Sequence, residues 1–488
     1  MGKTLKQKAA SGMVWTAFSH YSNMIIQFIS GIVLARLLSP YDYGCIGMLT
    51  IFMTLAEAFI DCGFGSALIQ KKNPTQEDYS TIFFWNIGMA ALLYTILFLC
   101  APAISRFYNI PLLCPVLRVQ GVILFIYAFN IIQRNRIKKS LNFKTLGIVS
   151  VCTAIVSLCI TIWMAYRGFG VWALVTQHIV SALIPCVTYW IVMKWRPSFV
   201  FSWKSFKELF SFGVYMFFTH LINKFCTKLT GLMIGKLYSA STLGFYSKAQ
   251  GTERLASHTI SSVMTSVTYP LYAQVQDDKA AMANMVKRLT STIAYFTFPL
   301  LFILMVAAEP IFVLLYSDKW LASVPYFQVL CIVGMADCLQ AVNNQTLAAI
   351  GKSRLMFQWV LIKRSLGLIF IIGGLYLWGM KGLLLGMILY NWFAYFVNVG
   401  LVSKYIGYKW YRQLLDLLPM ALVAGAFAGL GYLVITPLHL GLYLDGALKI
   451  AICVMGYLGW SLIFKPESYT YTLTIIPQKF RFWEKKSK

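Results

Sequence analysis

Charged residues are scarce in this chain, and acidic residues are the scarcest of them. Only 12% of its 488 residues are Asp, Glu, Lys or Arg, whereas 59% are hydrophobic. Soluble domains carry about 25% charged residues, so the composition excludes that class and fits a protein that crosses a membrane many times. Asp and Glu number 16 against 42 Lys and Arg. Such an excess of basic residues is compatible with binding to nucleic acid or to an anionic membrane surface. The positions of the basic residues along the chain distinguish the two.

Motifs for catalysis and for metal binding are missing as well. The 11 cysteines form no C-x-x-C pair, and no His/Cys cluster has metal-ligand spacing. There is no G-x-x-x-x-G-K-[ST] nucleotide loop and no G-x-S-x-G elbow. We therefore predict no catalytic residue, no metal site and no cofactor, and we do not expect an enzyme.

Apolar runs of about 20 residues, long enough to cross a bilayer, follow one another along the chain. The first begins after three lysines and imitates a signal peptide, but it is longer than the apolar region of one and has no cleavage-site pattern. The candidate spans are 13–34, 44–69, 80–101, 112–133, 145–166, 170–193, 208–234, 243–272, 289–312, 323–349, 355–378, 382–403, 413–436 and 445–464.

The basic residues show which loops face the cytoplasm. If the N-terminus is cytoplasmic, the loops on that side and the tail hold 28 Lys and Arg, and the outer loops hold 6. This bias is the positive-inside pattern, so we predict both termini in the cytoplasm. Basic segments next to a membrane face anionic lipids, and nucleic acid is not expected as a partner.

Residues 211–244 repeat residues 11–44 at a constant offset, with 9 identities and no gap, including Ser39 with Ser239 and Gly44 with Gly244. Six spans separate the copies, so both cross in the same direction and belong to parallel lobes. We predict an all-α polytopic membrane protein with about 14 transmembrane helices, in two six-helix lobes plus two extra helices. Its parts are an N-lobe (1–193), a linker (194–207), a C-lobe (208–404), the extra pair (405–464) and a basic cytoplasmic tail (465–488).

Several basic residues lie inside the predicted spans, where a cation is costly and marks a candidate functional site. Lys224 lies roughly 15 Å deep in a core of about 30 Å. Lys228 and His220 share its helical face at four-residue spacing, and Arg254 lies at similar depth on a span that also carries Gln250. Cations at mid-membrane suit an anionic group such as a phosphate. Buried ion pairing is the alternative.

Carboxylates lie inside the spans too. Glu57 and Asp61 follow two threonines along one face of the second span, and Glu253 and Asp337 lie on later spans. Buried carboxylates can exchange protons or hold a cation, which makes these four residues candidates for ion coupling. Each could equally neutralise a lysine or arginine across the cavity, and the sequence leaves both roles open.

The chain resembles the polysaccharide (Wzx-like, O-antigen type) flippases of the MOP superfamily. This superfamily also includes the lipid II flippases and the MATE drug exporters. The motifs that carry the likeness are ARLLSPYDYG (35–44), DCGFGSALIQ (61–70), IGKLYSASTLGFYSKAQ (234–250), VTYPLYAQVQDD (267–278) and EPIFVLLYSDKW (309–320).

The resemblance implies a flippase that moves undecaprenyl-pyrophosphate-linked oligosaccharide units across the bacterial inner membrane by alternating access, for O-antigen, capsule or exopolysaccharide synthesis. It implies an H⁺ or Na⁺ gradient or the membrane potential as the energy source. Cavity-facing basic residues of the family map to Arg36, Lys224, Lys228 and Arg254, while Met24 stands where a cation is common. The candidate substrate-binding residues are Lys224, Lys228, Arg254, Arg36, His220, Asn223 and Gln250.

Lys224 and Lys228 have no counterpart in the first repeat copy, so we expect the anion site on the C-lobe face of the cavity, across from Glu57 and Asp61. The expected partners are the lipid-linked oligosaccharide and anionic lipids, together with a polysaccharide polymerase and glycosyltransferases. A MATE-like drug exporter and a lipid II flippase are alternatives. A membrane-embedded glycan polymerase or ligase fits less well, because such enzymes commonly have a large outer loop and this chain has only short ones.

Overall fold

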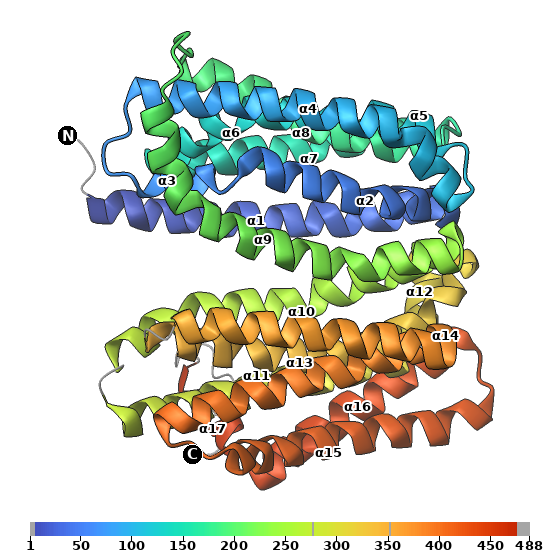
Figure 1. Ribbon diagram of the computed structural model, residues 1–488. Helices are drawn as coiled ribbons and strands as arrows, with labels where there is room; N and C mark the ends of the chain where they lie inside the picture. Colours follow the sequence, from blue (N-terminus) through green and yellow to red (C-terminus); the bar gives the residue numbers. More distant parts are fainter. Residues whose placement is uncertain (1–4, 276–277, 351–352, 476–488) are drawn as a thin grey trace. The chain divides into compact units, whose positions relative to one another are not determined.

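The computed structural model describes residues 5–275, 278–350 and 353–475, and within these ranges the only regular secondary structure is helical. The helices are long and belong to two compact units, Met1–Ser247 and Lys248–Lys488 (Figure 1). The helix α10 (Ala240–Gln274) begins in the first unit and continues in the second.

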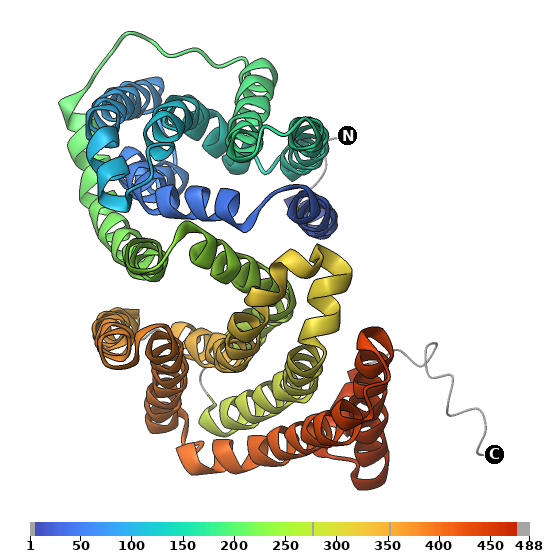
Figure 2. The ribbon, with the colours of Figure 1, turned by 90° about the vertical axis from the view of Figure 1, so that its right-hand side faces the viewer.

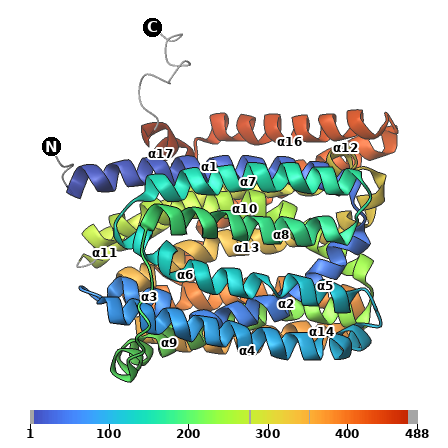
Figure 3. The ribbon, with the colours of Figure 1, turned by 90° about the horizontal axis from the view of Figure 1, so that it is seen from above.

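The first unit contains nine complete helices among its described residues. They are α1 (Leu5–Leu37), α2 (Pro40–Asp61), α3 (Phe64–Gln70), α4 (Gln76–Tyr108), α5 (Leu113–Gln120), α6 (Ile123–Lys139), α7 (Phe143–Tyr166), α8 (Val171–Met193) and α9 (Trp203–Leu237). α1 packs along α7, α6 along α8, and α2 along α9. Figure 2 looks nearly along these helices and Figure 3 across them, and both show α1 beside α7.

The second unit continues with α11 (Lys279–Val306), α12 (Ala308–Tyr316), η1 (Asp318–Ser323), α13 (Val324–Ala349), α14 (Ser353–Ile406), α15 (Trp410–Ile435), η2 (Thr436–Leu438), α16 (Leu442–Phe464) and α17 (Glu467–Ile475). The long α14 is a hairpin of two helices, because its backbone leaves helical geometry at Trp378 and Gly379. Gly374 and Gly382 then face each other across the hairpin, and a Cβ on Gly374 would lie 2.2 Å from the carbonyl oxygen of Gly382.

Each of the fourteen predicted spans coincides with helical structure in the described residues. Ten helical segments are long and apolar enough to cross a membrane, and one of them, Gln358–Ile406, holds the two spans of the α14 hairpin. The remaining three predicted spans coincide with α1, α9 and α10. The predicted fold class is therefore confirmed, and the chain is a multi-pass membrane protein.

Three of the predicted spans are broken helices. The span 289–312 is divided between α11 and α12 at Ala307. The span 44–69 is divided between α2 and α3 at Cys62 and Gly63, both of which have left-handed backbone angles. The span 112–133 is divided between α5 and α6, and α6 continues past the predicted end to Lys139. The apolar run ends before the helix does, because helical hydrogen bonding continues through a polar and basic last turn.

The two copies of the internal repeat have the same local structure at the ends of their helices. The helices α1 and α9 end at the equivalent residues Leu37 and Leu237. The hydroxyl of Ser39 then accepts a hydrogen bond from the backbone N–H of Asp42 at 3.3 Å, and Ser239 accepts one from Thr242 at 3.0 Å. Both serines cap the helix that follows, as N-cap hydroxyls commonly do.

The starts of α2 and α10 approach each other through equivalent glycines. A Cβ on Gly44 would lie 1.7 Å from the carbonyl oxygen of Ala240, and a Cβ on Gly244 would lie 1.9 Å from that of Pro40. Pro40 and Ala240 are themselves repeat equivalents. The contact is therefore reciprocal, and each copy supplies the same glycine.

The predicted lobe limits, which rest on the repeat, differ from the limits of the two compact units. α9, the first helix of the predicted C-lobe, packs within the first unit. The lobe limits rest on the repeat and stay a prediction. Of the predicted tail, residues 476–488 lie outside the described residues. The part that forms α17 packs on α11, where Glu467 accepts a hydrogen bond from Lys287 at 2.8 Å.

Candidate functional site

Helices α2 and α9 place carboxylates opposite basic residues within the first unit. Lys224 and His220 of α9 line a cavity of about 220 Å³ together with Asp61, the last residue of α2. Glu57, one turn earlier on α2, interacts electrostatically with both Lys224 and Lys228. The structure thus brings together five residues that the sequence singles out, three from α9 and two from α2.

The break between α2 and α3 holds Asp61 in place. The backbone N–H of Gly65 donates a hydrogen bond to Oδ1 of Asp61 at 3.1 Å. At Gly63 the backbone is left-handed, and a Cβ there would lie 2.3 Å from the carbonyl oxygen of Gly213 on α9. Only glycine permits both this conformation and this close approach. The carboxylate is therefore fixed next to the close contact between the α2–α3 break and α9.

Asp61 also lines a second cavity, of about 200 Å³, on the α6 side. Tyr127 borders both of these cavities, so they adjoin. The second cavity is lined by Arg134, Asn135 and Lys138 of α6. Asp61 therefore lies between the basic residues of α9 and those of α6.

A larger cavity of about 830 Å³ opens among α1, α6, α7 and α8. It shares Asn130, Arg134 and Lys138 with the second cavity, so each of the three cavities shares lining residues with the next. Hydroxyl and amide side chains dominate its polar wall, contributed by Thr16, Ser19, Asn23, Gln27, Ser150, Thr153 and Ser181.

Four predicted residues of this unit are not among those that line the three cavities, namely Glu57, Lys228, Arg36 and Asn223. Arg36 is exposed in the last turn of α1. Asn223 precedes Lys224 on α9, and its amide donates a hydrogen bond to the carbonyl oxygen of Thr219 at 2.9 Å. The equivalent Asn23 bonds the carbonyl oxygen of Ser19 in the same way, at 2.7 Å. Each repeat copy has this hydrogen bond within its own helix, which indicates that the asparagine has a structural role there.

The other predicted residues belong to the second unit. Glu253 of α10 is only 6% exposed, and among the described residues its Oε1 has no hydrogen-bond partner. It faces α13, where a Cβ on Gly334 would lie 2.1 Å from that oxygen. The next residue, Arg254, is exposed and interacts electrostatically with Asp337 of α13. Gln250 is half-buried on α10.

Comparison with known proteins identifies the family. The sequence model of a family described as "Polysaccharide biosynthesis protein" matches residues 33–325, more than half of the chain. The chain belongs to this polysaccharide biosynthesis family. The match covers the α2, α6 and α9 residues that line the cavities.

Named relatives of this family member come from several bacteria. It is 28% identical to the teichuronic acid biosynthesis protein TuaB of Bacillus subtilis (strain 168) over 358 aligned residues. The aligned region covers 73% of this chain and 74% of TuaB. It is 24% identical to the lipopolysaccharide biosynthesis protein WzxC of Escherichia coli (strain K12), over 84% of each chain. It is 22% identical to the succinoglycan biosynthesis transport protein ExoT of Rhizobium meliloti (strain 1021), over 74% of each chain.

The fold of this chain is similar to that of a solved structure. A structure described as the lipid II flippase MurJ in an inward closed conformation superimposes with a TM-score of 0.75 at 14% identity. The match covers 94% of this chain and 100% of that one. At this identity the likeness shows the fold alone. Together with the relatives it confirms the predicted family resemblance and the prediction of a transporter rather than an enzyme.

Sequence reasoning missed the basic residues of α6 in this family member. The predicted span ends at residue 133, so Arg134 and Lys138 fall in a loop that the sequence predicts to be cytoplasmic. A signal was nevertheless present, since Asn130, Arg134 and Lys138 recur every four residues and so share one helical face. In the structure all three line the same two cavities.

A polar chain in the second unit was missed as well. The ammonium of Lys363 donates to Oδ1 of Asn398 at 2.5 Å, and both residues are buried in the α14 hairpin. Asn398 in turn donates to Gln340 of α13 at 3.4 Å, and Gln340 donates to Asp337 at 3.4 Å. Amides at helical spacing on the predicted spans 323–349 and 382–403 were the available signal.

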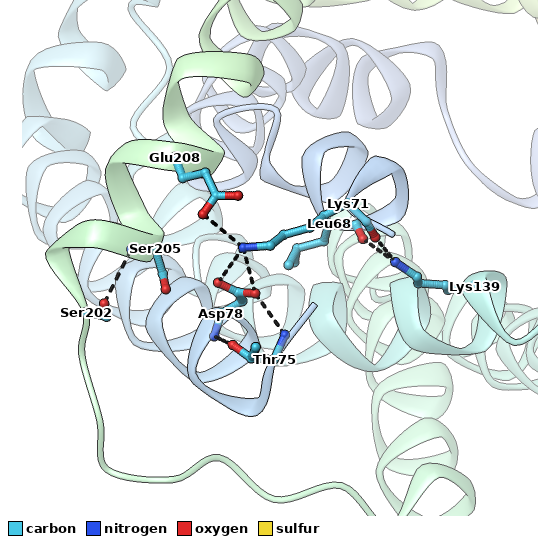
Figure 4. Close-up of polar contacts among 8 residues, drawn as sticks. All are labelled: Leu68, Lys71, Thr75, Asp78, Lys139, Ser202, Ser205 and Glu208. Carbon is cyan, nitrogen blue, oxygen red and sulfur yellow. Dashed lines mark hydrogen bonds and ion pairs between the residues drawn. The ribbon is translucent and has the colours of Figure 1, made fainter. Parts of the chain in front are cut away.

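A compact ionic cluster lies beyond α3, outside the membrane-spanning segments (Figure 4). Lys71 lies 3.0 Å from Asp78 of α4 and 3.0 Å from Glu208 of α9. Burial alone lowers the pKa of Lys71, but its hydrogen bonds to these carboxylates outweigh it and raise the pKa above the usual value. Lys139, the last residue of α6, donates to the carbonyl oxygens of Leu68 and Lys71. The cluster thus ties α9 to the ends of α3, α4 and α6.

Proposed function

We propose that this protein is a flippase for undecaprenyl-pyrophosphate-linked oligosaccharide repeat units in the synthesis of a bacterial surface polysaccharide. The lipid-linked unit enters from the cytoplasmic leaflet of the inner membrane, and alternating access releases its sugar on the outer side while the lipid tail stays in the bilayer. Family membership and the named relatives support a role in polysaccharide biosynthesis.

The observation that carries the proposal is the series of adjoining cavities in the first unit. A pyrophosphate-linked sugar bears negative charge and many hydroxyl groups, and neither can enter hydrocarbon without large cost. The walls of the cavities supply hydroxyls, amides and cations inside a bundle whose outer surface is apolar. Such walls replace the water that the headgroup loses, and cations make the strongest hydrogen bonds to phosphate oxygens.

The carboxylates beside Lys224 suggest how an ion could drive the cycle. Glu57 and Asp61 interact electrostatically with Lys224, so in their ionised form they compete with an anionic substrate for that cation. Protonation of the carboxylates, or binding of a cation to them, removes this competition. In the proposal, an H⁺ or Na⁺ gradient or the membrane potential acts through these residues, and Glu253 and Asp337 have the same role in the second unit.

The proposal includes a topology and a set of partners. Both termini lie in the cytoplasm, and the basic loops on that side contact anionic lipids. The glycosyltransferases that assemble the unit act before the flippase, and a polysaccharide polymerase acts on the unit after its release.

A deletion strain tests the proposal directly. Removal of the gene should stop surface polysaccharide production and leave lipid-linked single repeat units in the membrane. In intact spheroplasts these units should resist an added glycosidase and become sensitive only when the membrane is broken, because they remain on the inner face. A plasmid copy of the gene should restore normal polysaccharide.

Two results would contradict this function. Accumulation of units that the glycosidase reaches in intact spheroplasts would indicate polymerisation or ligation as the missing step. Normal polysaccharide together with increased drug sensitivity would indicate a drug exporter.

A further inference from the structure

The last two turns of α6 carry two cations that face a cavity without direct partners. Arg134 and Lys138 are four residues apart on one helical face, and both line the cavities of about 830 Å³ and 200 Å³. Among the described residues, neither side chain has an ion pair within 4 Å or a hydrogen bond from its terminal nitrogens. Lys138 is within electrostatic reach of Arg134, which repels it, and of Asp61. The carboxylate of Asp61 therefore partly offsets the charge of Lys138.

The neighbouring cavity wall has polar atoms that lack partners. Oδ1 of Asn130 and Oγ1 of Thr153 are buried, and among the described residues neither has a hydrogen-bond partner. Both residues line the larger cavity. Buried polar atoms in folded proteins are normally hydrogen-bonded, and a hydroxyl-rich ligand in this cavity would supply partners on this side of the wall.

The pair lies at the C-terminal end of α6. The partial negative charge of a helix C-terminus stabilises cationic side chains placed there. Tyr189, Phe143 and Pro185 supply an apolar part of the same wall. The cavity therefore combines a doubly cationic edge, unpaired hydroxyl and amide groups, and an apolar side.

We propose that this cavity is a binding site for the phosphate group of a polyprenyl-phosphate lipid. Arg134 and Lys138 hold the phosphate oxygens, and the first sugar lies against Asn130 and Thr153. The site rests on the proposed function and places the first capture of the substrate on α6, apart from Lys224 and Lys228 on α9. Asp61 lies between the α6 pair and Lys224, since it lines one cavity with Arg134 and Lys138 and another with Lys224.

Binding measurements on the full-length protein in nanodiscs test the site. The probe is farnesyl pyrophosphate, a short polyprenyl pyrophosphate, and farnesol serves as the probe without phosphate. We expect the Arg134→Ala, Lys138→Ala variant to bind farnesyl pyrophosphate about tenfold or more weakly, because charge-assisted hydrogen bonds are lost. Binding of farnesol should not change. Lys72→Ala, which removes an exposed cation from a loop predicted on the same side of the membrane, should bind both probes as the unchanged protein does.

Two nanodisc compositions separate the substrate from ordinary lipid headgroups. The loss of affinity should be the same in neutral phosphatidylcholine and in anionic phosphatidylglycerol. If phosphatidylglycerol abolishes binding to the unchanged protein, the pair binds bulk lipid phosphate and the proposal is wrong. Equal binding by the double variant and the unchanged protein would also overturn it. Size-exclusion profiles and melting temperatures show that the variants are folded, and Arg134→Lys, Lys138→Arg keeps both charges and should retain binding if the double-alanine protein does not fold.

A cell-based measurement distinguishes failure of this site from failure of the proposed function. In the deletion strain, the double-alanine variant should restore less than about a tenth of the surface polysaccharide that the unchanged gene restores. Full restoration by the variant, in a strain that accumulates inner-face lipid-linked units without the gene, would refute the site and leave the flippase function intact.

Discussion

The ammonium of Lys71 lies 3.0 Å from Oε2 of Glu208 and 3.0 Å from Oδ2 of Asp78. The first contact joins the segment after α3 to α9, the helix that carries Lys224. The partners differ in their surroundings, because the side chain of Glu208 is 57% exposed and that of Asp78 is 1% exposed. One lysine thus makes a surface ion pair and a buried one.

This difference predicts unequal effects of the two substitutions that break the cluster. Glu208→Ala should cost about 0.5 kcal/mol or less, because exposed ion pairs contribute little. Lys71→Ala should cost about 1–3 kcal/mol, because it leaves the buried Asp78 without its cation. Melting temperatures in detergent, followed with a thiol-reactive dye that reports exposure of the six buried cysteines, measure both. Equal losses would contradict the assignment.

The paired glycines at the starts of α2 and α10 predict matched defects. Gly44→Ala and Gly244→Ala should each cost about 3 kcal/mol, because the new methyl group meets a backbone carbonyl that no side-chain rotation can move. The control is Gly88→Ala in α4, where a Cβ meets nothing within 4 Å. It should leave the melting temperature unchanged or slightly raised, since Ala favours a helix over Gly by about 1 kcal/mol. A control as damaging as the other two would refute the close approach.

Variants of Lys224 decide between substrate binding and charge neutralisation. We expect the Lys224→Ala, Lys228→Ala protein to reach normal membrane levels and to restore less than about a tenth of surface polysaccharide in the deletion strain. Adding Glu57→Gln should not rescue export if the lysines bind substrate. Rescue by that third change would show that they serve only to balance the carboxylate, and normal export by the double variant would remove them from the site.

The close approach of Gly334 to Glu253 predicts a defect confined to packing in the second unit. Gly334→Ala should lower stability by about 1–3 kcal/mol, because its Cβ would lie 2.1 Å from Oε1 of Glu253. Gly429→Ala on α15, with nothing within 4 Å, is the matched control. If Glu253→Ala is introduced as well, the Gly334→Ala loss should shrink, and the same loss in both backgrounds would show that the carboxylate is not the obstacle.

The spans and their order could be predicted because a bilayer imposes one length on every apolar run. The breaks could not, since the run of residues 44–69 stays apolar across Cys62 and Gly63, where the helix stops. That break depends on Gly213, which lies far along the chain and allows α9 to approach. Contacts of this kind are tertiary and leave no mark in a hydropathy pattern.

The candidate site shows the same limit. Lys224 was identifiable because a lysine inside an apolar run is costly wherever it points. Arg134 and Lys138 follow the end of such a run, where basic residues are ordinary, and hydropathy alone could not place them on a continuing helix that faces a cavity. The repeat likewise could not show that Asn223 bonds its own helix, because the identity of Asn23 and Asn223 fits a structural role and a binding role equally.

The reciprocal contact of Gly44 with Ala240 and of Gly244 with Pro40 bears on how a chain of this kind could arise. When each of two equivalent segments contacts the other through the same residues, the contact has the two-fold symmetry of a homodimer interface. A half-length ancestor could make the same contact with a second copy of itself before the genes were joined. Fusion would then have preserved this interface without any new surface, and after fusion Lys224 and Lys228 were free to differ from Met24 and Phe28.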